Sequence, residues 1–128
     1  MRYTIEIPGK PVGKERPRMG RGGHMYTPPR TKKYEALVAQ HAIDACVQLM
    51  TGVRLRVQWH IGRTKGEGRR PKAHADLDNV VKTVMDGLQG VAYKNDREVE
   101  QLNAFFCDVP YGEDRIIITL DGHAIRDD

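Results

Sequence analysis

The chain has 128 residues, enough for one domain with a modest core, and we expect residues 1–128 to form a single domain. With 39% apolar and 30% charged residues, the composition is typical of a globular protein and excludes a disordered one. No apolar run reaches the roughly 18 residues of a membrane helix, and the first ten residues lack the apolar core of a signal peptide, so we expect a cytoplasmic protein with no membrane partner.

The net charge of +4 is unevenly distributed along the chain. Residues 1–33 carry nine Lys and Arg against two acids, and residues 54–72 carry seven against one. Residues 73–128, in contrast, carry twelve acids against five bases. Basic segments suit a polyanion, and clustered acids beside them suit a divalent cation. A mixed, solvated surface is the alternative that charge alone leaves open.

The first half of the chain predicts a strand, a long loop and a helix. Residues 2–7 alternate between apolar and polar side chains, which predicts the strand. Residues 8–30 hold five of the seven prolines and five glycines, which predicts a loop without regular structure. Residues 30–50 repeat apolar side chains at helical spacing, which predicts an amphipathic helix that Gly52 ends. Its predicted buried positions are Tyr34, Leu37, Val38, Ala42, Ala45 and Leu49.

The second half predicts three strands and one more helix. Residues 53–61 alternate cleanly and predict a half-buried strand, and residues 99–106 and 115–122 predict two more. A basic, glycine-containing loop follows the first of these strands. After it, the spacing of Leu77, Val81, Val84 and Leu88 predicts one buried stripe of a helix. The order β-α-β-α-β-β predicts an α/β (α+β) fold, a two-layer domain whose mixed sheet carries two helices on one face.

The sequence excludes several familiar ligand sites. It contains no GxxxxGK[ST] or GxGxxG phosphate loop and no HExxH zinc motif. An EF-hand beginning at Asp76 would need Gly and Glu where Val81 and Gly87 stand. Cys46 and Cys107 form no CxxC pair, which argues against a zinc ribbon and predicts two buried, reduced thiols.

Two carboxylates, Asp76 and Asp78, stand where the second helix begins. Because the apolar stripe starts at Leu77, Asp76 is expected at or before the N-cap. There the backbone is still extended, so both side chains can converge on one point, as they cannot at i and i+2 of a continuous helix. Hard oxygen ligands of this kind suit Mg²⁺. The alternative is that Asp76 caps the helix and that both acids complement its dipole.

Three neighbouring features favour a site over a cap. Lys82 lies one turn after Asp78 on the same face, where it forms either a surface ion pair or a cation beside a bound phosphate. The polar turn after the helix contains Asp96, Glu98 and Glu100, which is ordinary turn composition or the source of a third metal ligand. Finally, the basic stretch RRPKAH directly precedes the acids and would attract a phosphate backbone.

The run ADLDNVVKTVMDGLQGVAYKNDREV resembles the signature of the RusA-type Holliday junction resolvases, magnesium-dependent endodeoxyribonucleases often carried by phages and prophages. Its pattern is D-x-D-N-x-x-K on a helix, then a variable linker with an Asp near its end. The N-terminal GKERPRMGRGGHMYTP and the following TKKYE resemble the phage and Gram-positive branch of that family. The resemblance extends over nearly the whole chain.

The resemblance implies roles for particular residues. The catalytic carboxylates, which would also hold one or two Mg²⁺ ions, fall on Asp76, Asp78 and Asp96. The essential lysine falls on Lys82, and Asn79 takes a supporting role. The sequence leaves open whether Mn²⁺ can substitute for Mg²⁺, and no small-molecule cofactor is expected. The resemblance also implies a homodimer, which suits the two symmetry-related cuts that resolve a four-way junction and leave 5′-phosphate ends.

The basic segments are expected to contact backbone phosphates of branched DNA, which position a duplex without reading its sequence. The predicted DNA-contacting residues are Lys10, Lys14, Arg16, Arg18, Arg21, Arg69, Arg70 and Lys72. Two alternatives remain open at this point. Instead of a junction resolvase, the protein could be a broader structure-specific nuclease for branched DNA, or a non-catalytic DNA-binding module whose acids only cap a helix.

Overall fold

The longest strand of the protein, β4 (Met50–Gly62), lies inside a four-stranded sheet. The computed structural model describes residues 1–66 and 77–125 of the chain. Successive side chains of a strand point to opposite faces, so every second residue of β4 faces the core. The buried side chains are those of Val53, Leu55, Val57, Trp59 and Ile61, as the alternation predicts.

The other strands of the sheet are β1 (Arg2–Pro8), β5 (Val99–Val109) and β6 (Arg115–Ala124), in the spatial order β1-β6-β4-β5. β6 pairs antiparallel with both β1 and β4, whereas β5 pairs parallel with β4. The parallel pair requires a crossover, and the chain from β4 to β5 includes the second helix. The prediction of a mixed sheet is therefore confirmed.

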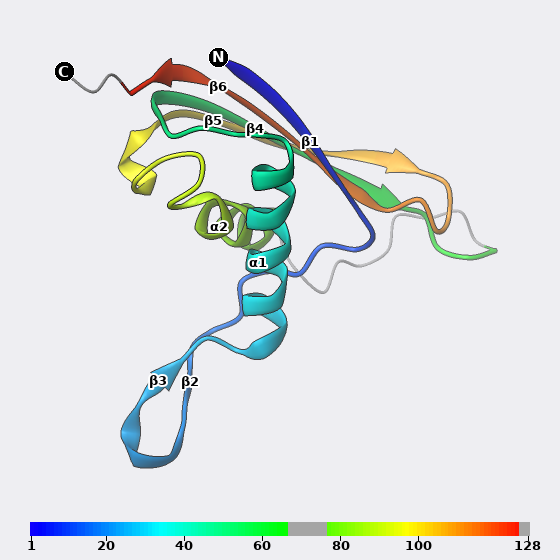
Figure 1. Ribbon diagram of the computed structural model, residues 1–128. Helices are drawn as coiled ribbons and strands as arrows, with labels where there is room; N and C mark the ends of the chain where they lie inside the picture. Colours follow the sequence, from blue (N-terminus) through cyan, green and yellow to red (C-terminus); the bar gives the residue numbers. More distant parts are fainter. Residues whose placement is uncertain (67–76, 126–128) are drawn as a thin grey trace.

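Two helices, α1 (Pro29–Asp44) and α2 (Leu77–Leu88), cover one face of this sheet (Figure 1). Val81, Val84 and Leu88 are buried and Leu77 packs against the core, so the predicted stripe of α2 is confirmed. The predicted two-layer α+β domain is likewise confirmed. Neither described helix combines the length and apolar character needed to cross a membrane.

The two helices approach each other closely at Gly87 of α2. A Cβ atom added there would lie 2.7 Å from the carbonyl oxygen of Glu35 and 2.8 Å from the Cβ of Val38, both on α1. Only glycine allows backbones to approach this closely without displacing one of them. Gly87 therefore fixes the distance between α1 and α2, and with it the position of the candidate site on α2.

The first helix ends earlier than its apolar spacing predicts. The residue at C′ is Cys46, in a left-handed conformation with φ 60°, and its N–H donates to the carbonyl of Ile43 while that of Val47 donates to Ala42. This is the hydrogen-bond pattern of a Schellman motif, which glycine usually forms. The prediction of a helix to residue 50 was therefore wrong, because the cysteine carries no signal for this turn.

Two of the predicted buried positions of this helix also differ from the structure. Leu37 is exposed, and Ala45 lies at the exposed end of the helix. The two cysteines were predicted to be buried, but Cys46 is exposed and Cys107 is half-buried on β5. Both are free thiols.

The proline- and glycine-rich segment is not irregular throughout. Arg18–Met19 (β2) and Met25–Tyr26 (β3) pair antiparallel around a short 3₁₀ turn, Arg21–Gly23 (η1). Gly22 and Gly23 have φ values of 81° and 80°, a left-handed turn that glycine permits. We call residues 18–26 the arm, because this ribbon projects away from the two layers (Figure 1). The prediction of a structureless loop was wrong here.

The sheet face opposite the helices remains open and polar. Arg54 and Arg56 of β4 are exposed on this face, and Arg54 pairs with Asp121 of β6 at 3.1 Å. Because these arginines lie on the far side of the sheet from α2, they serve below as charge-matched controls.

Candidate functional site

The first turns of α2 present two charged side chains to solvent. Asp78 lies in the first turn, and Lys82 lies one turn further along the same face. Both are exposed, on the side of the helix away from the buried stripe. In the described part of the chain, no ion pair joins the Asp78 carboxylate to the Lys82 ammonium. Both groups are therefore available to a ligand that approaches from solvent.

The start of α2 is held by the loop that follows β1. The backbone N–H of Lys14 donates to the carbonyl of Asn79 at 2.9 Å, and the hydroxyl of Thr83 donates to the same oxygen at 3.1 Å. Asn79 is half-buried and directly follows Asp78 in the first turn of α2. These bonds fix the first turn of α2 against the chain segment that leads into the arm.

The ammonium of Lys14 connects both helices. Its Nζ lies 2.8 Å from a carboxylate oxygen of Glu35 on α1 and 2.9 Å from one of Asp86 on α2. Burial lowers the pKa of Lys14, but the hydrogen bonds and attraction of Glu35 and Asp86 outweigh it, so its pKa lies above the ordinary value. Lys14 was predicted to contact DNA, yet its ammonium is engaged by two carboxylates and its side chain is 25% exposed. In this arrangement Lys14 positions the loop, α1 and α2.

No sequence signal identifies Glu35 and Asp86 as partners of Lys14. Glu35 lies on α1 and Asp86 near the end of α2, so only the packing of the helices brings the two carboxylates together. The charge pattern had placed Lys14 simply in a basic segment.

The predicted third carboxylate, Asp96, begins the short 3₁₀ helix η2 (Asp96–Glu98). Asn95 caps this turn, since its side chain accepts a hydrogen bond from the backbone N–H of Arg97 at 2.9 Å. Glu98 accepts a hydrogen bond from the hydroxyl of Thr51 at the start of β4. Asp96 is exposed and Glu98 is engaged, so of these two acids Asp96 is the one free to serve as a ligand.

The hydroxyl of Tyr93 lies between Asp96 and α2. It donates to the carbonyl of Met85 at 2.7 Å. Burial raises the pKa of the Tyr93 phenol, and the nearby carboxylates of Asp86 and Asp96 raise it further. Tyr93 is therefore a neutral hydrogen-bond donor that fixes the turn after α2, and with it the position of η2.

Asp78 lies in the first turn of α2, whereas Asp96 lies on η2, which follows the last turn of α2. The backbone N–H of Met50, at the start of β4, donates to Ala92 just after α2, and η2 bonds to the neighbouring Thr51. Asp78, in contrast, lies in the first turn of a helix of 12 residues, which spans about 18 Å. Asp76 lies outside the described residues. Among those described, no three His, Cys, Asp or Glu side chains are grouped closely enough to hold a metal ion.

The chemistry of these donors nevertheless fits Mg²⁺. Mg²⁺ prefers oxygen ligands, keeps several waters, and is usually held by one or two carboxylates together with substrate phosphates. Asp78 supplies one exposed carboxylate of this kind. Asp76, the other member of the predicted pair, stands two residues before it in the sequence. A complete cage of protein ligands is therefore not needed for a site at the start of α2.

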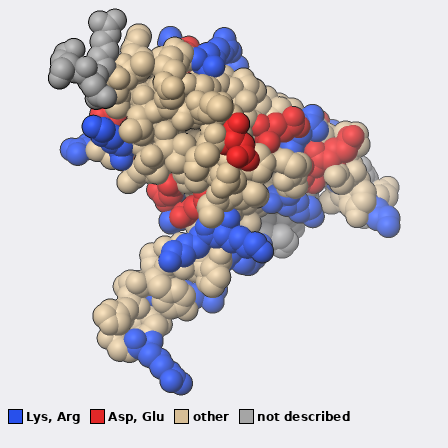
Figure 2. All heavy atoms as spheres, in the orientation of Figure 1, with Lys and Arg blue, Asp and Glu red and all other residues tan. Residues whose placement is uncertain are grey.

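The predicted DNA-contacting residues fall into two groups. Lys10, Arg16, Arg18 and Arg21 are exposed on the loop after β1 and on the arm, and Arg18 pairs with Glu15 at 3.5 Å while its side chain stays 67% exposed. Figure 2 shows Lys and Arg side chains at the end of the arm and where it joins the body. Arg69, Arg70 and Lys72 lie outside the described residues.

Three further cations were missed as candidates. Arg30, Lys32 and Lys33 are exposed in the first turns of α1, where the arm returns to the body. They belong to the basic segment of residues 1–33, so the charge pattern contained the signal. Together with the arm, they form a surface without a carboxylate between residues 16 and 34.

Comparison with known families gives one match. The family model described as Endodeoxyribonuclease RusA matches residues 8–121, which include every candidate site residue discussed above. A comparison with curated proteins finds no match.

Proposed function

Because the chain belongs to the RusA endodeoxyribonuclease family, we propose that it is a Mg²⁺-dependent hydrolase that resolves Holliday junctions by paired, symmetric cuts. The observation that carries this proposal is the exposed pair Asp78 and Lys82 on the first turns of α2, inside the matched segment. A helix cap alone would not need Lys82. A module that only binds DNA would not need the carboxylate of Asp78, which repels phosphate groups.

We assign each residue of the site one role. Asp76 and Asp78 hold the metal ion through carboxylate oxygens, and Asp96 supplies the third carboxylate. Lys82 neutralises negative charge that develops on the phosphate during hydrolysis. When bound, the ion supplies charge stabilisation of the phosphate and activation of water for attack. Asn79 and Lys14 hold the first turn of α2 in place through the backbone contact described above.

We also propose a homodimer, which the family resemblance implies and which would supply two symmetry-related sites. Within one chain, Asp78 lies in the first turn of α2, whereas Asp96 lies on η2, beyond the last turn of α2. In a two-fold dimer, η2 of one copy would adjoin the first turn of α2 of the other copy, and each site would contain residues of both. Two such sites related by symmetry would cut two opposed strands of a four-way junction.

The function is tested with a synthetic four-way junction. We expect Mg²⁺-dependent paired cuts with 5′-phosphate ends, lost in EDTA and recovered with Mg²⁺ or Mn²⁺. Flaps, forks and plain duplex of matched sequence are compared under the same condition. Equal cutting of flaps and forks would favour the broader branched-DNA nuclease. Tight junction binding without cuts under any metal would instead establish the non-catalytic module.

Replacing Arg16 and Arg18 together with Ala is expected to weaken junction binding and to reduce its salt dependence. The slope of log affinity against log salt should fall by about 0.9 for each phosphate contact that is lost. The charge-matched control is Arg54→Ala with Arg56→Ala on the open sheet face, which should leave the slope unchanged. Equal effects of both pairs would show that only net charge matters.

A further inference from the structure

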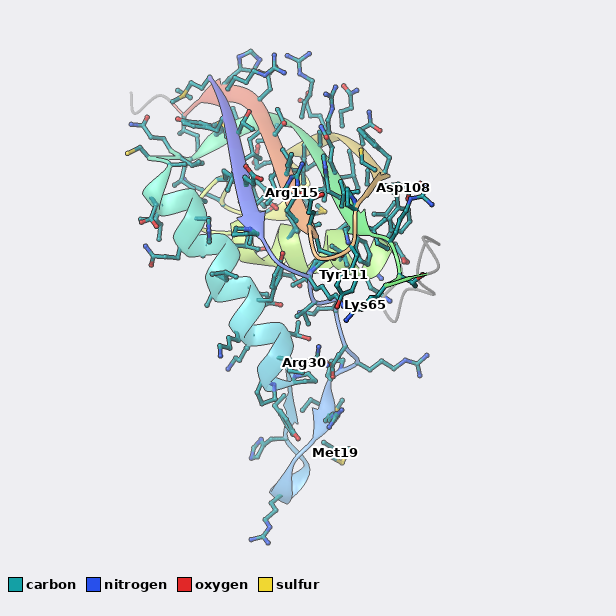
Figure 3. The ribbon with its side chains drawn as sticks, turned by 90° about the vertical axis from the view of Figure 1, so that its right-hand side faces the viewer. Met19, Arg30, Lys65, Asp108, Tyr111 and Arg115 are labelled. Atoms are coloured by element: carbon teal, nitrogen blue, oxygen red, sulfur yellow. The ribbon has the colours of Figure 1, made fainter. Side chains whose placement is uncertain are left out.

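The arm carries a face of two methionines. Met19 of β2 and Met25 of β3 are direct cross-strand partners, as are Arg18 and Tyr26. Because neighbouring residues of a strand point to opposite sides, both methionines share one face of the ribbon and Arg18 and Tyr26 share the other. Met19 is 70% exposed and Met25 is 60% exposed. Figure 3 shows Met19 on the arm, well away from the core, and Arg30 where the arm joins α1.

This apolar face contributes nothing to the folded core. A single exposed apolar residue on a surface needs no explanation, but two large ones paired on a projecting element indicate a contact surface. The core cluster and the partly buried side chains that pack against it include neither methionine. The two exposed methionines therefore indicate that the arm binds another molecule.

The charge around the methionines favours nucleic acid as that partner. Arg16, Arg18 and Arg21 border them, and no Asp or Glu occurs from residue 16 to residue 34. Within residues 1–66 and 77–125, the acid that pairs with one of these arginines is Glu15 at the root of the arm. A surface of this charge suits a phosphate backbone, which draws the arm to DNA and leaves its apolar face next to sugars and bases.

The dimensions of the arm suit entry into DNA. Six residues separate Glu15, whose backbone N–H bonds to the Thr31 hydroxyl, from Gly22 at the tip. At about 3.3 Å per residue these reach roughly 20 Å, beyond the ~8.5 Å depth of the major groove, and that groove admits a two-stranded ribbon. Methionine is a flexible side chain that packs well on aromatic rings, and apolar side chains of this kind wedge between base steps in other DNA-bending proteins.

We propose that the arm enters branched DNA and that Met19 and Met25 pack against nucleobases exposed at the branch point. Bases at a branch are separated at less cost than bases inside a continuous duplex, because part of their stacking is already lost. The arginines position the arm on phosphates, and the methionines distinguish a branch from a plain duplex. This inference rests on the proposed junction-binding function and adds the element that recognises the branch.

The experiment uses a four-way junction with 2-aminopurine at the branch point, and EDTA to prevent cutting. Binding of the wild-type protein should raise the fluorescence, because the probe loses its stacking partners. Replacing Met19 and Met25 together with Ala should remove most of this rise and weaken junction binding about tenfold relative to duplex binding. The salt slope should stay unchanged, since no phosphate contact is lost. The double replacement with Leu, which keeps the apolar volume, should retain the rise.

Ile43→Ala is the matched control, since Ile43 is 54% exposed on α1 and lies off the arm. It should behave as wild type, and circular dichroism should show that all variants are folded. A full fluorescence rise with the Ala double variant would overturn the proposal, as would wild-type binding without a rise. Wild-type cutting of the same junction in Mg²⁺ is measured in parallel. If the wild-type protein does not cut this junction, the proposed function itself is wrong. If it cuts normally but the fluorescence results differ from those expected, only the proposal for the arm is affected.

Discussion

Replacing Asp78 with Asn is expected to abolish cutting of a four-way junction in Mg²⁺ while junction binding stays intact or becomes tighter. Asn keeps the shape of the side chain but removes the charge that holds the metal ion. Metal ions supply several kcal/mol of transition-state stabilisation, so the rate should fall about a thousandfold or more. Binding should not suffer, because a negative charge near the phosphate backbone is removed. Single-turnover cleavage and gel-shift assays with the same junction measure the two effects separately.

Asp44→Asn provides the control for the Asp78 variant. Asp44 is exposed at the end of α1, where it accepts a hydrogen bond from Gln40, and an Asn there can accept the same bond. This variant should cut at the wild-type rate. If Asp78 only complements the helix dipole, its replacement would cost a few tenths of a kcal/mol to about 1 kcal/mol of stability and leave cutting unchanged. That result would show that the metal assignment is wrong.

Mixing chains that carry Asp78→Asn with chains that carry Asp96→Asn is expected to restore activity that neither variant has alone. In the proposed dimer, each site combines Asp78 of one copy with Asp96 of the other, so a mixed dimer contains one intact site and one doubly altered site. With random pairing, half of the dimers are mixed, and the total rate of cutting should recover to about a quarter of the wild-type value. The product should be a nicked junction, since only one of two sites works.

The design of the mixture separates shared sites from sites within one chain. Two differently tagged chains are refolded together, and dimers that carry both tags are purified and assayed, which should raise the rate to about half of the wild-type value. Each variant taken alone through the same procedure is the control. If both Asp78 and Asp96 of one chain serve the same site, every site in the mixed dimer has one defect and no activity returns. Light scattering establishes the dimer independently of any cutting.

Local patterns predicted most of the fold correctly. The alternation along residues 53–61 and the stripe from Leu77 to Leu88 identified β4 and α2, because burial against one neighbouring layer imposes a period of 2 on a strand and 3.6 on a helix. The order of elements then predicted two helices over one face of a mixed sheet. The predictions were wrong where a residue adopts a backbone conformation or a segment adopts a structure that its type does not usually adopt. Cys46 ends α1 in a conformation that glycine normally adopts, and a proline- and glycine-rich segment forms the arm.

The candidate site was only partly accessible to sequence reasoning. Charge and spacing identified Asp78 and Lys82 as candidates, and the resemblance selected Asp96 from the acids of the following turn. The structure describes all three as exposed. Spacing did not reveal where Asp96 lies relative to Asp78. The seven residues between α2 and η2 form no long helix or strand that would fix the direction of the chain. The hydrogen bonds of Met50 and Thr51 determine where that chain returns to the sheet.

By itself, the sequence determined the two long helices, the four strands of the main sheet, most of their buried positions and the residue types that carry the chemistry, because these follow from local periodicity and from the charge of each segment. The tertiary structure decided which charges are free to act. Lys14 and Arg16 are equivalent cations in the sequence, yet Lys14 is held between Glu35 and Asp86 while Arg16 stays exposed beside the arm. The physical reason is that an ion pair between residues far apart in the chain depends on how two helices pack, here at the close contact of Gly87 with α1.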